Sequence, residues 1–477
     1  MMTNRRRIYL LSPKEFSPEI IAVAFAKTSR SPKPFDEIAK ELTDDRSAEF
    51  HEKWVVGYGH SSVAEHAVLH LALENVSRLA IETIEGNRLA SYTEKSTRYQ
   101  QWDADAFYIP EEFTENGLET KFKETCAHLF KTYQICIPKV ADWLRGVMPK
   151  GEQESERAYQ RRLQPASVDI CRFLLPAASL ANVGMTINAR ALEYAICKML
   201  SSPLAEVQAI GERLGEVGKL ETPTLIKYAA CNAYLTSTRE KMMHLAGGIS
   251  VGEAGEPIKL HAWTPHGEDE VLAAILFRFG SEAGFEPCQD FVHSLSTTEK
   301  EALWDDLMLP RGQFDQPLRE CEYAQMTFEA VMDQGAYFEF KRHRMMTQTA
   351  QPLTPDLGFA VPLGIRDSGC EADYLAAMRN AADLYRQIAV THPVAASYII
   401  PNGFNRRVLF TMNLRQAFHF CKLRAAANAH FSIRRVAYQI AEKIKQVYPF
   451  AGRYLDIPEG ETPMTIETQF FSTTVTD

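Results

Sequence analysis

Residues 87–100, NRLASYTEKSTRYQ, concentrate side chains that bind anions. Arg88 and Arg98 stand among several hydroxyls, with a glutamate and a lysine between them. Guanidinium groups bind phosphates and carboxylates through paired, charge-assisted hydrogen bonds, which hydroxyls and backbone N–H groups supplement. The segment therefore predicts a loop that holds an anionic small molecule.

A distorted copy of this segment, KRHRMMTQTAQ, occupies residues 341–351. Arg344 and Thr347 have the spacing of Arg88 and Ser91, at an offset of 256 residues (344 − 88). The copy keeps arginines and has fewer hydroxyls. The two segments together indicate an internal repeat.

Two further pairs of segments support the repeat. RIYLLSPKEFSPEIIAVAFAK (7–27) resembles KLHAWTPHGEDEVLAAILFRF (259–279), and LLPAASLANVGMTINARALEYAICKM (174–199) resembles IIPNGFNRRVLFTMNLRQAFHFCKLR (399–424). In the second pair Pro401 matches Pro176 at an offset of 225 (401 − 176). The second repeat is therefore 31 residues shorter between these motifs (256 − 225), and we expect the extra residues of the first around 150–162.

The repeats predict two domains of 1–245 and 258–477. The segment between them, AGGISVGEAGEP (246–257), is rich in glycine and contains a proline, which is typical of a linker. It lacks the spacing of a phosphate-binding glycine loop.

Hydrophobic spacing indicates which elements position the polar loop. Residues 67–74 are apolar and partly alternating, which predicts a strand, and 76–86 have helical spacing that ends at Gly86. Asn413 and Arg424 are eleven residues apart, about three helical turns, so they share one helix face. Strands mixed with helices in each half predict an α/β or α+β fold, in which each domain is a mixed sheet packed with long helices.

Composition restricts the ligand and the cellular setting. A net charge of −9 argues against nucleic acid as a partner, so local arginines must hold any anion. The nine cysteines form no CxxC pair, which indicates free thiols and no metal site. No run approaches the roughly 20 apolar residues of a membrane span, and MMTNRRRIYLL lacks the apolar core of a signal peptide. We expect a cytoplasmic protein.

The motifs resemble those of the flavin-dependent thymidylate synthases, whose signature has the form RHRxxSxNExSxRY. Residues 91–99 read Ser-x-Thr-Glu-x-Ser-x-Arg-Tyr, and residues 342–347 read Arg-His-Arg-x-x-Thr. Upstream, GHSSVAEH (59–66) is similar to the family's His-x-Ser/Thr-x-x-Glu-His stretch. NARAL (188–192), and NLRQAF with KLR (413–424), are similar to its closing pattern.

This resemblance implies two tandem domains of that family and reductive methylation of dUMP at C5. It implies FAD as the cofactor, NADPH as the reductant and methylenetetrahydrofolate as the carbon donor. The flavin carries the hydride chemistry while the protein binds and orients. Family members are homotetramers with active sites between subunits, so we expect a homodimer that forms a pseudo-tetramer.

Neither repeat carries the whole signature, and the losses are complementary. The first repeat has Gly-Asn-Arg at 86–88 in place of Arg-His-Arg, and Met199 in place of the family's substrate-binding arginine. The second keeps Arg424 but has lost most of the hydroxyl loop, and Ser397 replaces the arginine found as Arg172. Complementary retention predicts a composite site to which each repeat contributes part.

The resemblance assigns roles to residues on both repeats. The expected catalytic residues are Arg424, Glu94 and Ser96. The expected substrate-binding residues are Arg98, Arg172, Arg342, Arg424, Ser96, Lys95 and Thr97. The expected FAD-binding residues are His60, Ser62, Ser91, Thr93, Glu94, His343, Arg344, Asn188, Arg190, Asn413 and Arg415. No metal ligand is expected.

Simpler interpretations stay open for single residues. Arg98 and Glu94 would also suit a surface ion pair, Asn413 a helix N-cap, and 342–344 a solvated basic face. Glu339 stands where the family has a glutamine near the pyrimidine, and Thr93 replaces an asparagine. These departures leave open another pyrimidine nucleotide, a related one-carbon transfer, or a flavin- or nucleotide-binding relic without turnover.

Overall fold

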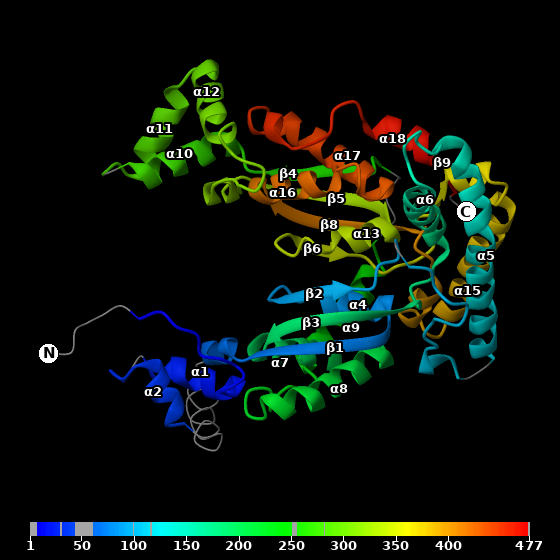
Figure 1. The fold of residues 1–477 in the computed structure, drawn as a ribbon, viewed down its shortest axis with the longest axis horizontal. Coiled ribbons are helices and arrows are strands. Elements are labelled where there is room, and N and C mark those ends of the chain that lie inside the picture. Colours follow the sequence, from blue (N-terminus) through cyan, green and yellow to red (C-terminus); the bar gives the residue numbers. More distant parts are fainter. Residues whose placement is uncertain are drawn as a thin grey trace. The chain divides into compact units, whose positions relative to one another are not determined.

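The structure is a computed structural model that describes residues 7–28, 31–42, 61–98, 100–114, 117–249, 255–280 and 282–475 (Figure 1). The chain forms two compact units. Unit 1 comprises Met1–Lys95, Phe107–Asn116 and Ser179–Val251, and unit 2 comprises Ser96–Ala106, Gly117–Ala178 and Gly252–Asp477. The units therefore do not follow the repeat boundaries predicted at 245 and 258, because 117–178 of the first repeat packs with the second.

Unit 1 is built on a three-stranded antiparallel sheet of order β1-β3-β2. Its elements are α1 (Pro18–Lys27), α2 (Phe35–Lys40), the 3-10 helix η2 (Ser61–His66), β1 (Val68–Ser77), α4 (Arg78–Glu85), β2 (Ala90–Glu94), η3 (Glu111–Phe113), β3 (Leu180–Asn188), α7 (Ala189–Leu200), α8 (Ala205–Glu221) and α9 (Ala233–Ala246). The strand predicted at 67–74 and the helix predicted at 76–86 are thus present as β1 and α4.

Unit 2 contains a four-stranded antiparallel sheet of order β4-β5-β8-β6 and the antiparallel pair β7-β9. Its first elements are α5 (Leu118–Val147), α6 (Glu156–Cys171), η4 (Arg172–Leu174), β4 (Ile258–Trp263), α10 (Gly267–Phe279), α11 (Phe285–Ser294), α12 (Thr297–Met308), η5 (Arg319–Glu322), β5 (Gln325–Asp333) and α13 (Gln334–Phe340). The remainder are β6 (Thr347–Ala350), β7 (Phe359–Pro362), α14 (Leu363–Asp367), α15 (Glu371–Ala389), η6 (Ala395–Ile399), β8 (Asn405–Asn413), α16 (Leu414–Arg424), α17 (Phe431–Val447), η7 (Ala451–Tyr454), α18 (Pro463–Phe470) and β9 (Phe471–Val475).

Strand pairing reproduces the offsets of the sequence repeat. Ser91 of β2 pairs with Thr186 of β3, and Thr347 of β6 pairs with Thr411 of β8. The differences are 256 (347 − 91) and 225 (411 − 186), the two values of the sequence comparison. All strand pairs of the described sheets are antiparallel, so of the two predicted classes the chain is α+β.

The same capping chemistry starts the equivalent helices of both units. Asn188 accepts a hydrogen bond from the backbone N–H of Ala191 at the start of α7, and Asn413 accepts one from Gln416 at the start of α16. Ser77 caps α4 and Asp333 caps α13 in the same way. A side-chain oxygen at this position satisfies one of the unpaired N–H groups of the first turn. Each cap fixes where a strand ends and a helix begins.

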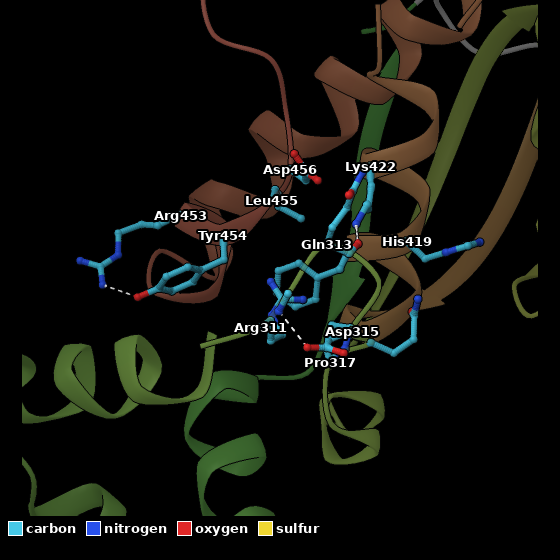
Figure 2. A pocket seen from close by; sticks show the side chains of 13 residues that line it. Arg311, Gln313, Asp315, Pro317, His419, Lys422, Arg453, Tyr454, Leu455 and Asp456 are labelled. Carbon is cyan, nitrogen blue, oxygen red and sulfur yellow. Dashed lines mark hydrogen bonds between the residues drawn. The ribbon is translucent and has the colours of Figure 1, made fainter. Parts of the chain in front are cut away.

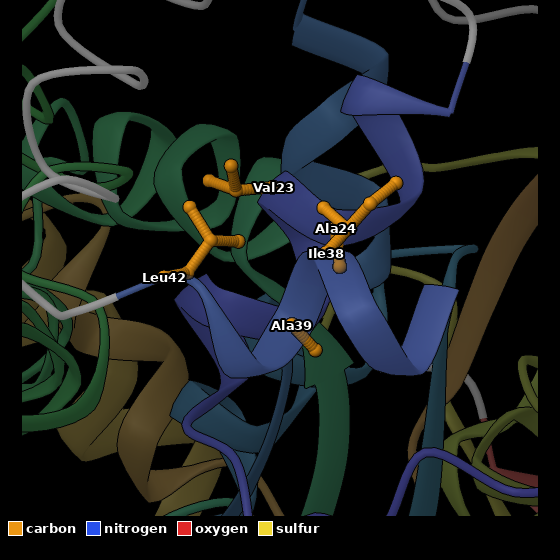
Figure 3. Packing of buried hydrophobic residues seen from close by; sticks show 5 residues of the cluster. All are labelled: Val23, Ala24, Ile38, Ala39 and Leu42. Atoms are coloured by element: carbon orange, nitrogen blue, oxygen red, sulfur yellow. The ribbon is translucent and has the colours of Figure 1, made fainter. Parts of the chain in front are cut away.

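Apolar residues bury the remaining faces of both units. In unit 1, Val23 and Ala24 of α1 pack with Ile38 and Ala39 of α2 and with Leu42 in a small cluster (Figure 3). In unit 2, α16 and α17 lie along the sheet (Figure 1), and Phe328 of β5 stacks with Phe410 of β8 at a centroid distance of 5.3 Å. All nine cysteines are free thiols, and most of them are buried.

The segments matched at Pro176 and Pro401 lie against each other within unit 2. The two prolines form an isolated antiparallel bridge, flanked by backbone hydrogen bonds from Ala177 N to Ile400 O (2.9 Å) and from Gly403 N to Phe173 O (2.9 Å). Corresponding segments of the two repeats therefore pair antiparallel. This pairing fixes the end of α6, which carries Arg172, against the second repeat.

Candidate functional site

A cluster of charged side chains in unit 2 unites residues from both sequence repeats. Its cations are Arg98, which follows β2, Arg172 at the end of α6, and Arg424 at the end of α16. Its carboxylates are Asp169 on α6 and Glu339 on α13. We call these five residues the arginine cluster.

Arg172 lies at the centre of the cluster and is 3% exposed. Its Nη2 donates to Glu339 Oε1 (3.2 Å) and to the backbone oxygen of Gly335 (3.4 Å), and its Nη1 lies 3.5 Å from Thr97 Oγ1. Its Nε has no hydrogen-bond partner among the described residues. Its backbone oxygen accepts a hydrogen bond from Asn402 Nδ2, which holds the end of α6 in place.

Glu339 joins Arg172 to Arg424. Its Oε1 accepts from Arg172 and its Oε2 accepts from Arg424 Nη1, both at 3.2 Å. The side chain is 9% exposed, so both ion pairs are largely removed from water. A carboxylate with one cation on each side is thereby compensated for the cost of burial.

Arg98 forms the most closely bonded pair of the cluster. Its Nε lies 3.0 Å from both Asp169 oxygens and its Nη2 lies 2.8 Å from Oδ2, a fork-like bidentate arrangement. Ser96 Oγ accepts a hydrogen bond from the Arg98 backbone at 3.2 Å. Burial raises the pKa of Asp169, while the nearby Arg172 and Arg98 oppose that effect.

His343 orients Arg424 from the opposite side. Arg424 Nε donates to His343 Nε2 at 2.9 Å, and the Gln416 side-chain amide lies 3.2 Å from Nδ1. Burial lowers the pKa of His343 well below its usual value, and the charge of Arg424 adds to this effect. The ring is therefore neutral with its proton on Nδ1, so Gln416 must turn its carbonyl oxygen toward it.

A second buried imidazole, His430, closes the cluster near Asp169. Its Nε2 lies 3.1 Å from the backbone oxygen of Asp169, and its Nδ1 accepts from the backbone of Ser432 at 3.1 Å. Burial lowers the pKa of His430 well below the usual value, and the positive charges of Arg172 and Arg98 lower it further. Both histidines are neutral, so the charge here is carried by arginines and carboxylates.

The structure brings together many of the predicted substrate-binding residues. Ser96, Thr97, Arg98, Arg172 and Arg424 all belong to the cluster or contact it. Arg342 is exposed. Burial is the main cause that lowers the pKa of Arg424, and the positive charge of Arg342 lowers it further. Lys95 belongs to unit 1, where its backbone N–H donates to Asn182 O at 2.9 Å.

Glu94, predicted as a catalytic and flavin-contacting residue, lies in unit 1 and does not belong to the arginine cluster. Its side chain is 1% exposed and forms an ion pair with Arg78 at 3.0 Å, where Arg78 is 3% exposed. The surface pair of Arg98 with Glu94, the simpler interpretation of the sequence, is wrong, because Arg98 binds Asp169 instead. Arg78 and Glu94 together hold α4 against β2.

Two predicted flavin-binding hydroxyls, Ser91 and Thr93, point from β2 to one face of the unit 1 sheet. They line an open hollow of about 350 Å³ together with His70 and Thr186, whose Nδ1 and Oγ1 atoms are 2.9 Å apart. Gly184 also lines it.

The other predicted cofactor residues have partners of their own. Asn188 and Asn413 cap helices, so the capping interpretation of Asn413 is confirmed. Arg190 is paired with Glu65, and Arg415 binds Glu322 at 2.8 Å and the Pro317 backbone oxygen at 3.0 Å. Ser62 is exposed on η2, Arg344 is half-buried, and His60 and Tyr99 lie outside the described residues.

A separate cavity of about 340 Å³ opens beside α16 in unit 2 (Figure 2). Arg311, Lys422 and Arg453 line it together with Asp315 and Asp456. Lys422 and Arg453 bind nearby groups: Lys422 donates to the Gln313 backbone, and Arg453 donates to Asp305 (3.1 Å) and to Tyr454 Oη (3.0 Å). The cavity contains none of the predicted site residues.

Sequence reasoning missed Asp169, Gln416 and His430. Asp169 precedes Arg172 by three residues, which places both on one face of α6, so helical spacing was an available signal. His430 is 261 residues from Asp169, and no local pattern connects them. Such partners are set by the packing of 117–178 against the second repeat.

The sequence matches the family described as "Thymidylate synthase complementing protein" (Thy1) twice, over residues 13–224 and 259–450. The two matches correspond to the two repeats and to the equivalent sheets of units 1 and 2. The chain belongs to this family.

Individual relatives are of two kinds. A protein named "UPF0159 protein" from Chlamydia muridarum is 31% identical over 87% of this chain and 82% of its own length. A UPF0159 protein from Thermoplasma acidophilum is 26% identical over 89% of this chain and 91% of its own length. A protein named "Flavin-dependent thymidylate synthase" from Sulfolobus acidocaldarius is 30% identical over 48% of this chain and 78% of its own length. Relatives of the second kind therefore match about half of this chain.

Proposed function

We propose that the chain is a flavin-dependent enzyme that transfers a one-carbon unit to C5 of a pyrimidine nucleotide, with dUMP as the candidate substrate. The observation that supports this most is the arginine cluster, in which Arg172 of the first repeat and Arg424 of the second bind one carboxylate. Motifs that are incomplete in each repeat thus supply one group of side chains.

The charge of the cluster suits a nucleotide phosphate. Arg98, Arg172, Arg424 and the nearby Arg342 carry four positive charges, against the two carboxylates of Asp169 and Glu339. A phosphate monoester carries nearly two negative charges at neutral pH. We assign phosphate binding to Arg98 and Arg172, supplemented by the hydroxyls of Ser96 and Thr97.

Arg424 is suited to the base of the nucleotide. His343 holds its Nε and Glu339 holds its Nη1, so the guanidinium is fixed before a ligand arrives. A fixed cation beside the pyrimidine carbonyls would stabilise the negative charge that develops when C5 becomes nucleophilic. No cysteine belongs to the described cluster, in agreement with a reaction in which no thiol attacks the ring.

A flavin needs a surface for its ring system. In unit 1, the hollow beside Ser91 and Thr93 offers exposed hydroxyls and an imidazole, which fits a ring that exchanges hydrogen bonds at its edge. When bound, FAD would supply the hydride chemistry; the residues of this chain bind and orient.

The remaining expectations of the resemblance belong to this proposal. NADPH would be the reductant, methylenetetrahydrofolate the carbon donor, and a homodimer the assembly. Among the described residues, no helix combines the length and the apolar character needed to cross a bilayer.

A nucleotide- or flavin-binding relic without turnover is the second candidate. It is favoured by the ion pairs that occupy Arg98, Arg172 and Arg424, since each of these guanidiniums already has a carboxylate partner. A related one-carbon transfer to C5 of another pyrimidine nucleotide would use the arginine cluster in the same way, to bind the phosphate and the base.

Two measurements on the full chain test the proposal. The purified protein, after addition of FAD and desalting, should keep an oxidised-flavin absorbance spectrum. It should then release tritium from dUMP labelled at C5, and the release should require both methylenetetrahydrofolate and NADPH. Flavin retention and dUMP binding without tritium release would support the relic. If neither FAD nor dUMP binds, both candidates are wrong.

A further inference from the structure

The Glu339 carboxylate bridges Arg172, the arginine assigned to the phosphate, and Arg424, the arginine assigned to the base. Each guanidinium donates to a different oxygen of this carboxylate at 3.2 Å. A phosphate oxyanion accepts hydrogen bonds from a guanidinium as a carboxylate does. The Arg172 guanidinium therefore already holds an anion that the protein supplies.

The bonds that Arg172 makes are long for a buried guanidinium. They measure 3.2, 3.4 and 3.5 Å, whereas charge-assisted N–H···O bonds are usually about 2.7–2.9 Å long. Its Nε has no partner among the described residues although the residue is only 3% exposed. Arg98, in contrast, holds Asp169 through bonds of 2.8–3.0 Å. Arg172 has unused capacity for an additional acceptor.

The backbone that surrounds this guanidinium is anchored. Asn402 Nδ2 donates to the Arg172 backbone oxygen at 3.0 Å, which holds the end of α6. Gly335, whose backbone oxygen accepts from Arg172 Nη2, lies in the first turn of α13, which Asp333 caps. The neighbours of Arg172 are therefore held in place by the backbone.

We propose that Glu339 is an internal competitor for the guanidinium of Arg172, and that it determines how tightly this guanidinium binds a phosphate group. A phosphate must displace the carboxylate from Arg172 or share the guanidinium with it. The inference rests on the proposed function only in taking the phosphate to be that of a nucleotide.

The test compares the wild-type protein with Glu339→Gln in calorimetric titrations at constant ionic strength. The probes are inorganic phosphate, dUMP and deoxyuridine. The amide has nearly the same shape and removes one negative charge beside the ligand, which in a partly buried site changes affinity by about tenfold or more. We expect inorganic phosphate and dUMP to bind Glu339→Gln at least about tenfold more tightly, and deoxyuridine to bind both proteins equally.

A matched control is Glu329→Gln. Glu329 is also a glutamate of unit 2 paired with an arginine, Arg407, but it lies on β5 outside the cluster. Its replacement should leave all three affinities unchanged. Thermal unfolding gives a second readout: phosphate should raise the unfolding temperature of Glu339→Gln by several degrees more than that of the wild type, because the ligand replaces the lost carboxylate.

The outcomes separate the inference from the proposed function. Equal binding of dUMP to the wild type and a folded Glu339→Gln overturns the inference and leaves the nucleotide function in place. Tighter binding of inorganic phosphate, with dUMP no better than phosphate, supports the inference and overturns the nucleotide function. Tighter binding of deoxyuridine overturns the inference, since the effect would then concern the base.

Discussion

Arg172 Nη2 and Glu339 Oε1 lie 3.2 Å apart although the two residues are 167 positions apart in the sequence. The first belongs to the end of α6 and the second to α13, so the contact exists only because 117–178 packs with the second repeat. Through Glu339 the contact extends to Arg424.

Arg172→Ala should weaken nucleotide binding by roughly 10- to 100-fold, the usual effect of losing hydrogen bonds to a charged group. Arg172→Lys should restore little of the affinity, because an ammonium cannot donate to Glu339, Gly335 and a ligand from one plane. Titration of dUMP into each variant checks both. Arg386→Ala is the control, since Arg386 is about half exposed and paired with Asp383 on the surface of α15. Wild-type affinity in Arg172→Ala would contradict the assignment.

The Arg98–Asp169 pair should show measurable coupling in a double-mutant cycle. The three bonds are 2.8–3.0 Å long and the two side chains are 21% and 14% exposed, so we expect about 1–2 kcal/mol, more than a surface pair contributes. Denaturant unfolding of Arg98→Ala, Asp169→Ala and the double variant measures it. The exposed Arg213–Glu216 pair of α8 is the control and should show coupling near zero. Equal coupling in both pairs would count against a bidentate contact in solution.

Glu268 should make unit 2 less stable as the pH rises. Burial raises its pKa to about 7, while the backbone N–H groups of Ala451 and Phe450 oppose the shift. Between roughly pH 4.5 and 7 the folded state keeps a proton that the unfolded state releases, so the free energy of unfolding falls across this range, by an amount on the order of 3 kcal/mol. Glu268→Gln should remove this part of the pH dependence. Urea unfolding at several pH values, with the exposed Glu286→Gln as control, tests it; parallel pH profiles for wild type and Glu268→Gln would contradict it.

Gly403→Ala should destabilise the segment that pairs the two repeats. A Cβ there would lie 2.7 Å from Tyr374 Oη, 2.9 Å from Met378 Cε and 3.2 Å from Phe173 Cδ1, and overpacking of this kind costs about 1–3 kcal/mol. Gly146→Ala near the end of α5 has nothing within 4 Å of its Cβ and should stabilise by up to about 1 kcal/mol. Thermal unfolding of both variants gives opposite signs; a stabilised Gly403→Ala would show that the close packing is absent in solution.

The sequence predicted local elements better than it predicted long-range packing. Hydrophobic spacing and Gly86 predicted β1 and α4. The repeat offsets of 256 and 225 reappear in the strand pairings of Ser91 and Thr347. These features depend on neighbours along the chain or on direct comparison of the repeats. Residues 150–162, around which we expect the extra residues of the first repeat, form the turn before α6 and its first turns.

Packing of 117–178 with the second repeat could not be predicted, because it depends on contacts between segments more than 160 residues apart, such as those of Arg172 with Gly335 and Glu339. For the same reason the simpler interpretation paired Glu94 with Arg98, whereas in the structure Glu94 binds Arg78 and Arg98 binds Asp169. Asn413 was ambiguous because one amide can cap a helix or bind a ligand, and the cap is what the structure contains.

Tritium release from C5-labelled dUMP by the flavin-loaded protein tests the central claim most directly, when wild type, Arg172→Ala and Arg424→Ala are compared. The composite cluster predicts release by the wild type that requires methylenetetrahydrofolate and NADPH, and a loss of roughly 100-fold or more in each variant, one from either repeat. No release by a wild type that retains its flavin, or release that either substitution leaves unchanged, would contradict the claim.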